Sequence, residues 1–216
     1  TKKKRKGFVQ ADKLAKNWGI GLEAARRTVQ ATTQAAVRDF RHTTGGRRLK
    51  PNAWMLRYPR RECPVYTDTF YGPCKSLAGN KYLQVYATDF HYIRTFPMQS
   101  KRETHHTLEE LFRTTGIPSA LIPDNAKELT EGTFRKVAKR YNCPILPVES
   151  YTPNANAAED VVRELKRSYT RKMVEKAVPQ LLWDYCYNWC SLVRTFTALN
   201  IKYLQGRTPY AVMTGE

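Results

Sequence analysis

The stretch that decides the fold is Val65-Tyr66-Thr67-Asp68-Thr69-Phe70-Tyr71. Its β-branched and aromatic residues predict a β-strand, and only Asp68 departs from this composition. A carboxylate among such neighbours loses hydration on burial, which costs free energy unless a cation or a hydrogen-bond donor satisfies it. We therefore expect Asp68 to be either an acid on an edge strand or a ligand of a positively charged group.

Further elements follow this strand at short intervals. Strands are expected at residues 81–88, 91–96, 119–122 and 144–148, and helices at 102–114, 134–141 and from 155 onward. Three meandering strands, then alternating helices and strands, then a helical run indicate a mixed α/β layered domain.

The segment before the strand has a different pattern. Residues 11–36 carry apolar side chains at three- and four-residue steps, and Gly19-Ile20-Gly21 interrupts them after about two turns. A short helix, a glycine turn and a longer helix are typical of helix-turn-helix modules. The second helix carries polar side chains suited to DNA, among them Arg26 and Arg27. The alternative is a helical hairpin that only packs on the next domain.

Composition divides the chain into four parts. Residues 1–10 are a basic tail, 11–45 the helical module, 46–60 a basic linker rich in glycine and arginine, and 61–216 the α/β domain. The run Lys2-Lys3-Lys4-Arg5-Lys6 indicates a nuclear-import signal or a phosphate-binding arm, with a solubilising tail as the alternative.

Net charge points to a polyanionic partner. The 216 residues contain 37 Lys and Arg against 19 Asp and Glu, a formal charge of +18. Residues 1–60 hold 16 basic and 3 acidic side chains, or +13, which leaves +5 for residues 61–216. Such an excess of positive charge favours nucleic acid as the binding partner, and an anionic membrane surface is the second candidate. No apolar run approaches the ~18 residues of a membrane span, and a hydrophobic fraction of 41% predicts a packed core.

Cysteine and histidine spacing excludes a recognisable zinc site. The five cysteines contain no Cys-x-x-Cys pair, and the four histidines do not stand at zinc-finger spacings. We therefore expect free thiols in a reducing compartment.

Two more acids stand at positions where α/β domains commonly carry functional side chains. Asp124 follows the short predicted strand at 119–122, and Glu159 lies near the start of a helix. Each has an ordinary explanation, an Asx turn for Asp124 and a helix N-terminal acid for Glu159. Together with Asp68 they could hold Mg²⁺ in a strongly basic protein. Phosphodiester chemistry commonly uses two such ions, ~3.5–4 Å apart, bound by hard oxygen ligands.

The three acids resemble the DDE triad of retroviral and LTR-retrotransposon integrases. There are 55 residues between Asp68 and Asp124 and 34 between Asp124 and Glu159, close to the family's pattern. Local phrases resemble the copia-type branch over residues 60–216. They are Asp68-Thr69-Phe70-Tyr71-Gly72-Pro73, Asp89-Phe90-His91-Tyr92-Ile93-Arg94, Asp124-Asn125-Ala126-Lys127-Glu128, Asn156-Ala157-Ala158-Glu159 and Gly206-Arg207-Thr208-Pro209.

Three features depart from the family. Ala126 stands where the second-acid motif has glycine, and the two-His, two-Cys zinc module is replaced by residues 11–36. The chain also stops inside a family phrase, at Gly215-Glu216. A fragment of a longer polyprotein is therefore expected.

The resemblance implies an RNase H-like core with a mixed five-stranded sheet flanked by helices. It implies 3′-end processing and strand transfer of element DNA, with Asp68, Asp124 and Glu159 holding two Mg²⁺ ions that Mn²⁺ can replace. Contacts to DNA are assigned to Asn156, Arg163, Lys166 and Arg167, together with Arg26 and Arg27 of the helical module. Arg163 and Lys166 share the helical face of Glu159, although an ordinary solvated face is the alternative.

The implied partners are double-stranded DNA, as element ends and as target, and further copies of the chain. No membrane and no small-molecule cofactor are expected. The implied location is the nucleus, after a cytoplasmic particle stage as part of the polyprotein. Two alternatives stay open: a DDE transposase or nuclease on the same fold, and a catalytically decayed integrase that only binds DNA.

Overall fold

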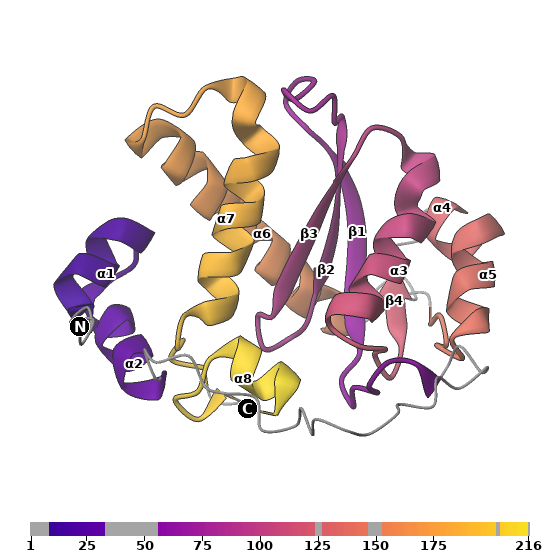
Figure 1. Cartoon of the computed structure of the whole chain (residues 1–216), viewed down its shortest axis with the longest axis horizontal. Coiled ribbons are helices and arrows are strands. Elements are labelled where there is room, and N and C mark those ends of the chain that lie inside the picture. The colour runs from indigo at the N-terminus through magenta and orange to yellow at the C-terminus, as the bar shows by residue number, and fades with distance from the viewer. Residues whose placement is uncertain (1–8, 33–55, 124–126, 147–152, 202–203, 216) are drawn as a thin grey trace, which may run out of the picture.

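The computed structural model describes residues 9–32, 56–123, 127–146, 153–201 and 204–215, with the backbone alone at 127 and 153–158. Within these ranges a four-stranded sheet lies between two groups of helices, and a pair of short helices packs at one end (Figure 1). None of the described helices is long and apolar enough to cross a membrane. The predicted mixed α/β class is confirmed.

The N-terminal hairpin consists of α1 (Ala11–Trp18) and α2 (Leu22–Ala31). Helix α1 ends at Gly19, whose φ of 63° lies in the left-handed region that glycine adopts without steric cost. Gly21 then precedes α2 in an extended conformation. The predicted helix, glycine turn and helix are thus present. Residues 1–8 of the predicted tail, 33–45 of the module and 46–55 of the linker lie outside the described residues.

The sheet has the order β3-β2-β1-β4. Its strands are β1 (Val65–Tyr71), β2 (Tyr82–Ala87), β3 (Ile93–Met98) and β4 (Leu121–Pro123). The first three form the predicted antiparallel meander, whereas β4 pairs with β1 in parallel. A parallel pair needs a crossover connection, and helix α3 (Thr104–Thr114) supplies it. Because β1 is an interior strand, Asp68 does not lie on an edge strand.

The predicted fifth strand is not present in the described residues. Ile145 makes one isolated parallel bridge to Leu121. Leu121 donates its N–H to the Pro144 carbonyl, and Leu146 donates to the Leu121 carbonyl, both at 2.8 Å. Pro144 has no N–H to continue the ladder. Residues 147 and 148 lie outside the described part, so the described sheet has four strands rather than five.

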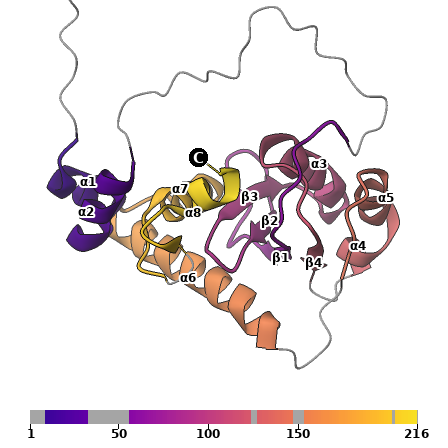
Figure 2. The same ribbon diagram turned by 90° about the horizontal axis from the view of Figure 1, so that it is seen from below.

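Two groups of helices cover the two faces of the sheet. Helix α3 with α4 (Lys127–Thr130) and α5 (Gly132–Arg140) lies on one face, and α6 (Pro153–Glu175) with α7 (Trp183–Phe196) on the other (Figures 1 and 2). Three short elements complete the described part: η2 (Lys101–Glu103), η3 (Gln180–Leu182) and α8 (Pro209–Thr214).

Each face of the sheet has its own apolar core. Phe112 and Phe134 are buried on the α3 side, and Trp183 and Leu165 on the α6 side. Burying one such side chain stabilises the fold by about 1.5–3 kcal/mol. Since side chains alternate along a strand, Asp68 points to the α6 side together with Phe70, whose ring lies 5.3 Å from that of Tyr187.

The hairpin is attached to the α/β domain through α2. The Ala198 N–H donates to the Thr28 hydroxyl at 2.9 Å, and the Arg27 Nε donates to the Ala198 carbonyl at 3.4 Å. Thr28 is buried. A Cβ at Gly19 would stand 1.7 Å from the Lys172 Nζ, so this lysine packs directly against the end of α1. Figure 2 shows the hairpin beside the end of α6.

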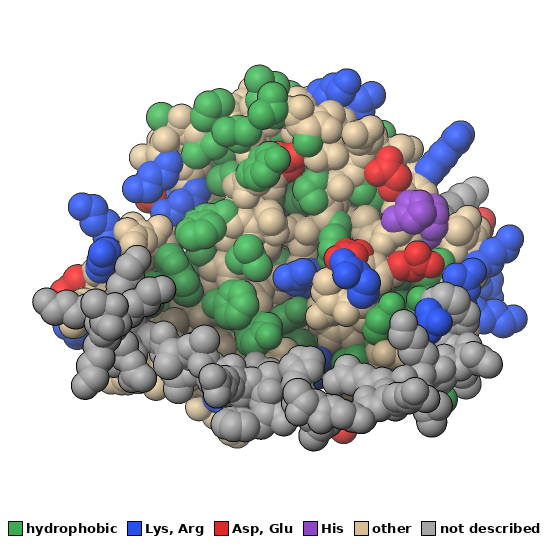
Figure 3. Space-filling model, in the orientation of Figure 1, with side chains coloured by type: hydrophobic (Ala, Val, Ile, Leu, Met, Phe, Trp, Pro, Cys, Tyr) green, Lys and Arg blue, Asp and Glu red, His purple; other side chains and the backbone are tan. Residues whose placement is uncertain are grey.

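An apolar stripe is left exposed along α7. Leu181, Tyr185 and Trp189 follow one another at four-residue steps and are 45–61% exposed. Figure 3 shows hydrophobic side chains gathered over this part of the molecule. Leu181 belongs to η3, directly before α7, and Trp189 also lines a smaller cavity next to the N-terminal hairpin.

His91 connects the turn between β2 and β3 to α7. Its φ of 64° is unusual for a residue other than glycine. The Arg194 Nη2 lies 3.1 Å from the His91 Nδ1. Burial, assisted by the positive charge of Arg194, lowers the pKa of His91 to about 4. The ring is therefore neutral at physiological pH and accepts a hydrogen bond from the arginine.

We expect His91 to make folding stability depend on pH between about 6.5 and 4. In this window the unfolded imidazole binds a proton and the folded one does not, so acidification favours unfolding, by at most about 1.4 kcal/mol per pH unit. His91→Asn tolerates the positive φ and does not titrate. Urea unfolding at pH 7 and pH 4.5 should show the stability advantage of the wild type shrinking at the lower pH. The prediction is contradicted if the wild type is more stable than His91→Asn by the same free energy of unfolding at both pH values.

Candidate active site

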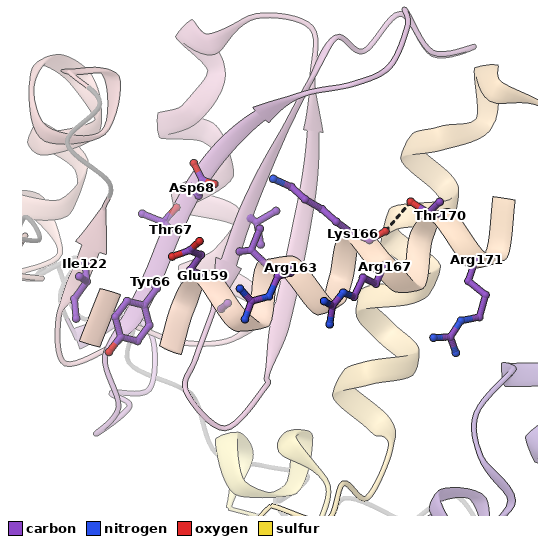
Figure 4. Close-up of a pocket in the computed structure, with 13 residues that line it drawn as sticks. Tyr66, Thr67, Asp68, Ile122, Glu159, Arg163, Lys166, Arg167, Thr170 and Arg171 are labelled. Carbon is purple, nitrogen blue, oxygen red and sulfur yellow. Dashed lines mark hydrogen bonds between the residues drawn. The ribbon is translucent and has the colours of Figure 1, made fainter. Parts of the chain in front are cut away.

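Strand β1 positions the first predicted acid. Asp68 pairs with Val85 of β2, and its half-buried side chain faces α6. Opposite it, the exposed Glu159 projects from α6. Both carboxylates line one cavity of about 930 Å³ between the sheet and the helix (Figure 4). The structure therefore brings together two acids that are 91 positions apart in the sequence.

Apart from the acids, the basic side chains and two threonines, the wall of this cavity is largely apolar. Val85, Ala87, Ile122 and Val162 contribute to its lining. Apolar walls limit the number of waters that compete for a bound ion or phosphate, and they strengthen electrostatic interactions.

Three arginines line the α6 side of the cavity. Arg163, Arg167 and Arg171 stand at four-residue steps and project from successive turns of α6; we call them the arginine row (Figure 4). Arg163 pairs with Asp160, and Arg167 with Glu164 at 2.7 Å. Such exposed pairs are worth up to about 1 kcal/mol, so a phosphate group could replace them at small cost.

Lys166 is exposed, and its ammonium group also reaches the sheet. Its Nζ lies 4.8 Å from the centre of the Phe70 ring, a cation–π contact. Phe70 stands two residues after Asp68 on the same face of β1. A positive charge is therefore held next to the acidic end of the cavity.

Asp124, the second predicted acid, lies outside the described residues. The strand before it is described: Pro123 pairs with Thr67, the residue immediately before Asp68. The described part of β4 therefore ends one residue before Asp124 in the sequence, at a residue that is paired one position before Asp68. Among the described residues there is no group of three or more His, Cys, Asp or Glu side chains that could hold a metal ion. Two members of the predicted triad, Asp68 and Glu159, are among the described residues.

A further ion pair joins Lys101 to Glu128, which stands four positions after Asp124 in the sequence. The Lys101 Nζ donates to Glu128 Oε1 at 2.5 Å, and it lies 5.6 Å from the centre of the Tyr71 ring. The hydrogen bond from Lys101 lowers the pKa of Glu128, so this carboxylate stays ionised. It connects α4 to the start of α3. Sequence analysis did not single out Lys101, because no local pattern relates it to a residue 27 positions away.

The predicted DNA-contact residues have different surroundings. Arg163, Lys166 and Arg167 line the cavity. Arg26 is exposed on α2 and pairs with Glu23 at 2.9 Å, whereas Arg27 is engaged with the Ala198 carbonyl. The side chain of Asn156 lies outside the described part, although its backbone belongs to α6.

Two cavity residues were missed by the sequence analysis. Arg171 continues the arginine row by one more turn, and Thr170 donates its hydroxyl to the Lys166 carbonyl at 3.0 Å. The four-residue spacing from Arg167 to Arg171 is the signal that could have identified the arginine.

Comparison by sequence finds no relatives: no protein-family model and no curated protein matches the chain. Comparison of the fold, in contrast, finds similar solved structures. The structure is similar to the catalytic core domain of BIV integrase, with a TM-score of 0.56 and 11% identity over 71% of this chain and 95% of that chain.

A second similar structure is the simian T-cell lymphotropic virus intasome in complex with PP2A regulatory subunit B56 gamma. The TM-score is 0.55 and the identity 15%, over 72% of this chain and 58% of that chain. This chain therefore spans little more than half the length of the intasome chain. Both similarities define the fold: the described α/β domain has an integrase-like RNase H fold.

Proposed function

We propose that this chain is an integrase-type polynucleotidyl transferase that processes element DNA ends and joins them to target DNA. The observation that carries the proposal is the meeting of Asp68 and Glu159 in one cavity beside the arginine row. The integrase-like fold supports the same reaction class. The resemblance of the motifs to copia-type elements supports that branch of the family.

Asp68 and Glu159 suit a magnesium site. Carboxylate oxygens are the hard donors that Mg²⁺ prefers, and both side chains face the same cavity. We propose Asp124 as the third ligand, because its neighbour Pro123 is paired beside Asp68. Two Mg²⁺ ions, or Mn²⁺ in their place, would activate a water or a DNA 3′-hydroxyl and stabilise the leaving oxygen.

The basic side chains of α6 are proposed to hold the DNA. Arg163, Arg167 and Lys166 would bind backbone phosphates near the carboxylates, and Asn156 and Arg26 would add contacts. Phosphate contacts set the position of a duplex without reading its sequence. We further propose action in the nucleus, with the basic run at residues 2–6 serving import, and no small-molecule cofactor.

Two other functions use the same features. A DDE transposase or a nuclease would cleave donor DNA or RNA–DNA hybrids with the same carboxylates. A decayed integrase would bind DNA without chemistry. A panel of duplex DNA, RNA–DNA hybrid and element-end substrates with Mg²⁺ distinguishes a transposase or nuclease from an integrase. The strand-transfer experiment below distinguishes a decayed integrase from an active one.

We expect Asp68→Asn and Asp124→Asn each to reduce strand transfer at least about 100-fold, because each variant removes a charged metal ligand. The assay joins a labelled element-end oligonucleotide to a supercoiled target. Glu110→Gln is the matched control, since this exposed carboxylate lies on α3 and outside the cavity. It should leave joining unchanged.

The result that overturns the catalytic proposal is equal joining by wild type and both aspartate variants while all of them bind DNA. Equal loss in the Glu110→Gln control would point to general damage rather than to a ligand.

Metal binding should depend on the same cavity. Glu159→Gln should weaken Mn²⁺ binding by at least about tenfold, because the ion loses one anionic ligand. Electron paramagnetic resonance of free Mn²⁺ measures this directly. Glu175→Gln is the control on the same helix, where the carboxylate pairs with Lys172 at 3.1 Å. Equal affinities for both variants would exclude Glu159 as a ligand.

We also propose that the chain forms homo-oligomers through the apolar stripe of Leu181, Tyr185 and Trp189. Exposed apolar patches commonly mark protein–protein contacts. Replacing Tyr185 and Trp189 together by lysine should shift the protein toward the monomer in light scattering coupled to gel filtration. Leu146→Lys, at an apolar residue that is 54% exposed elsewhere, should not. An unchanged mass for the double variant would place any contact elsewhere.

A further inference from the structure

A second, smaller cavity lies where the N-terminal hairpin meets α6 and α7. It measures about 250 Å³, and we call it the hairpin notch. Gly21 and Ala24, at the start of α2, form one side of it, and polar side chains line the rest: Glu164, Ser168, Arg171 and Lys172 of α6 and Arg194 of α7. The proposed chemistry of the first cavity uses none of these groups except Arg171.

Positive charge in the notch is only partly balanced. Lys172 pairs with Glu175 at 3.1 Å, and Glu164, the acid in the lining, pairs with Arg167 at 2.7 Å. Arg171 makes no ion pair within the described residues. Glu164 is also the carboxylate that acts electrostatically on Arg194. Arg171 and Arg194 are thus the side chains with charge available to a ligand.

Donors without acceptors also meet at the notch. The Arg194 Nε is buried and has no hydrogen-bond partner in the described part of the chain. Such a group costs about 1–3 kcal/mol when it stays unsatisfied. At α2, Gly21 has no side chain to accept hydrogen bonds from the first-turn amides, and these amides carry the positive end of the helix dipole. An anion in the notch would accept hydrogen bonds from these amides and balance the positive charge of Arg194, without contacting its buried Nε.

Arg171 connects the notch with the candidate active site, because it lines both cavities. It stands twelve residues after Glu159 on one straight helix, about 18 Å along the axis at 1.5 Å per residue. This distance corresponds to about five base pairs of duplex. The arginine row is therefore a continuous basic track from the carboxylates to the hairpin.

We propose that the hairpin notch binds a backbone phosphate of the duplex DNA that occupies the candidate active site, about five base pairs from the carboxylates. This inference rests on the proposed function. A phosphodiester fits because it is a small anion whose oxygens accept from arginine and from helix amides. The hairpin thereby contributes to DNA binding through the cavity that its docking creates, rather than through its exposed face alone.

The test is the salt dependence of binding to a 20-base-pair duplex of arbitrary sequence, measured by fluorescence anisotropy without divalent ions. Each lost phosphate contact lowers the slope of log K against log salt by about 0.9. Arg171→Gln and Ala24→Asp should each do so, with roughly tenfold weaker binding at 0.1 M salt. Ala24→Asp keeps α2 stable, because an acid in the first turn suits the helix dipole, yet it puts a negative charge in the notch.

Matched controls separate a contact from net charge. Lys139→Gln removes one positive charge, and Thr133→Asp adds one negative charge to the first turn of another helix; both residues are exposed on α5. They should leave the slope unchanged. An unchanged slope for Ala24→Asp, whatever Arg171→Gln does, or equal changes in the controls, overturns the proposal.

The two proposals fail separately. If the notch variants keep the wild-type slope while Asp68→Asn abolishes joining, only the notch is wrong. If joining does not depend on Asp68 but the slope falls with Ala24→Asp as well as with Arg171→Gln, the notch stands and the proposed chemistry fails; Ala24 decides, because it lines the notch alone.

Discussion

Strand β1 is paired on both sides, antiparallel to β2 and parallel to β4, and the candidate site depends on this double pairing. In the parallel register the last residue of β4, Pro123, pairs with Thr67, the residue immediately before Asp68. A shift of one residue would turn Asp68 toward the buried core beneath α3, since alternate residues of a strand face opposite sides. Helix α6 then closes the cavity and brings Glu159 to it.

Charge is distributed along α6 so that the folded protein remains stable without DNA. Arg163 and Arg167 each pair with an acid three residues earlier on the helix, at little gain in free energy. The same weak pairs can be exchanged for phosphate contacts. Lys166 differs, because it packs on Phe70 and its position is held by the sheet.

Several elements could be predicted from the sequence because their patterns are local. Strand β1 has the predicted bounds, and the glycine turn between α1 and α2 is where the pattern indicates. The fifth strand stays a prediction, since the described residues show one parallel bridge, from Ile145 to Leu121, and residues 147 and 148 lie outside the described part. The hydrogen bond from the Arg27 Nε to the carbonyl of Ala198 could not be predicted either, because the partner is 171 positions away; its contact with DNA stays a prediction.

By itself, the sequence determined the α/β class, the basic N-terminal part and the three acids as candidates, because composition, periodicity and spacing are properties of neighbouring residues. Only the tertiary structure decided that Asp68 and Glu159 line one cavity, that Arg171 belongs to it and that the hairpin creates a second one. These relations depend on strand register and on how helices pack against the sheet. Both arise from contacts between residues far apart in the chain, which no local pattern contains.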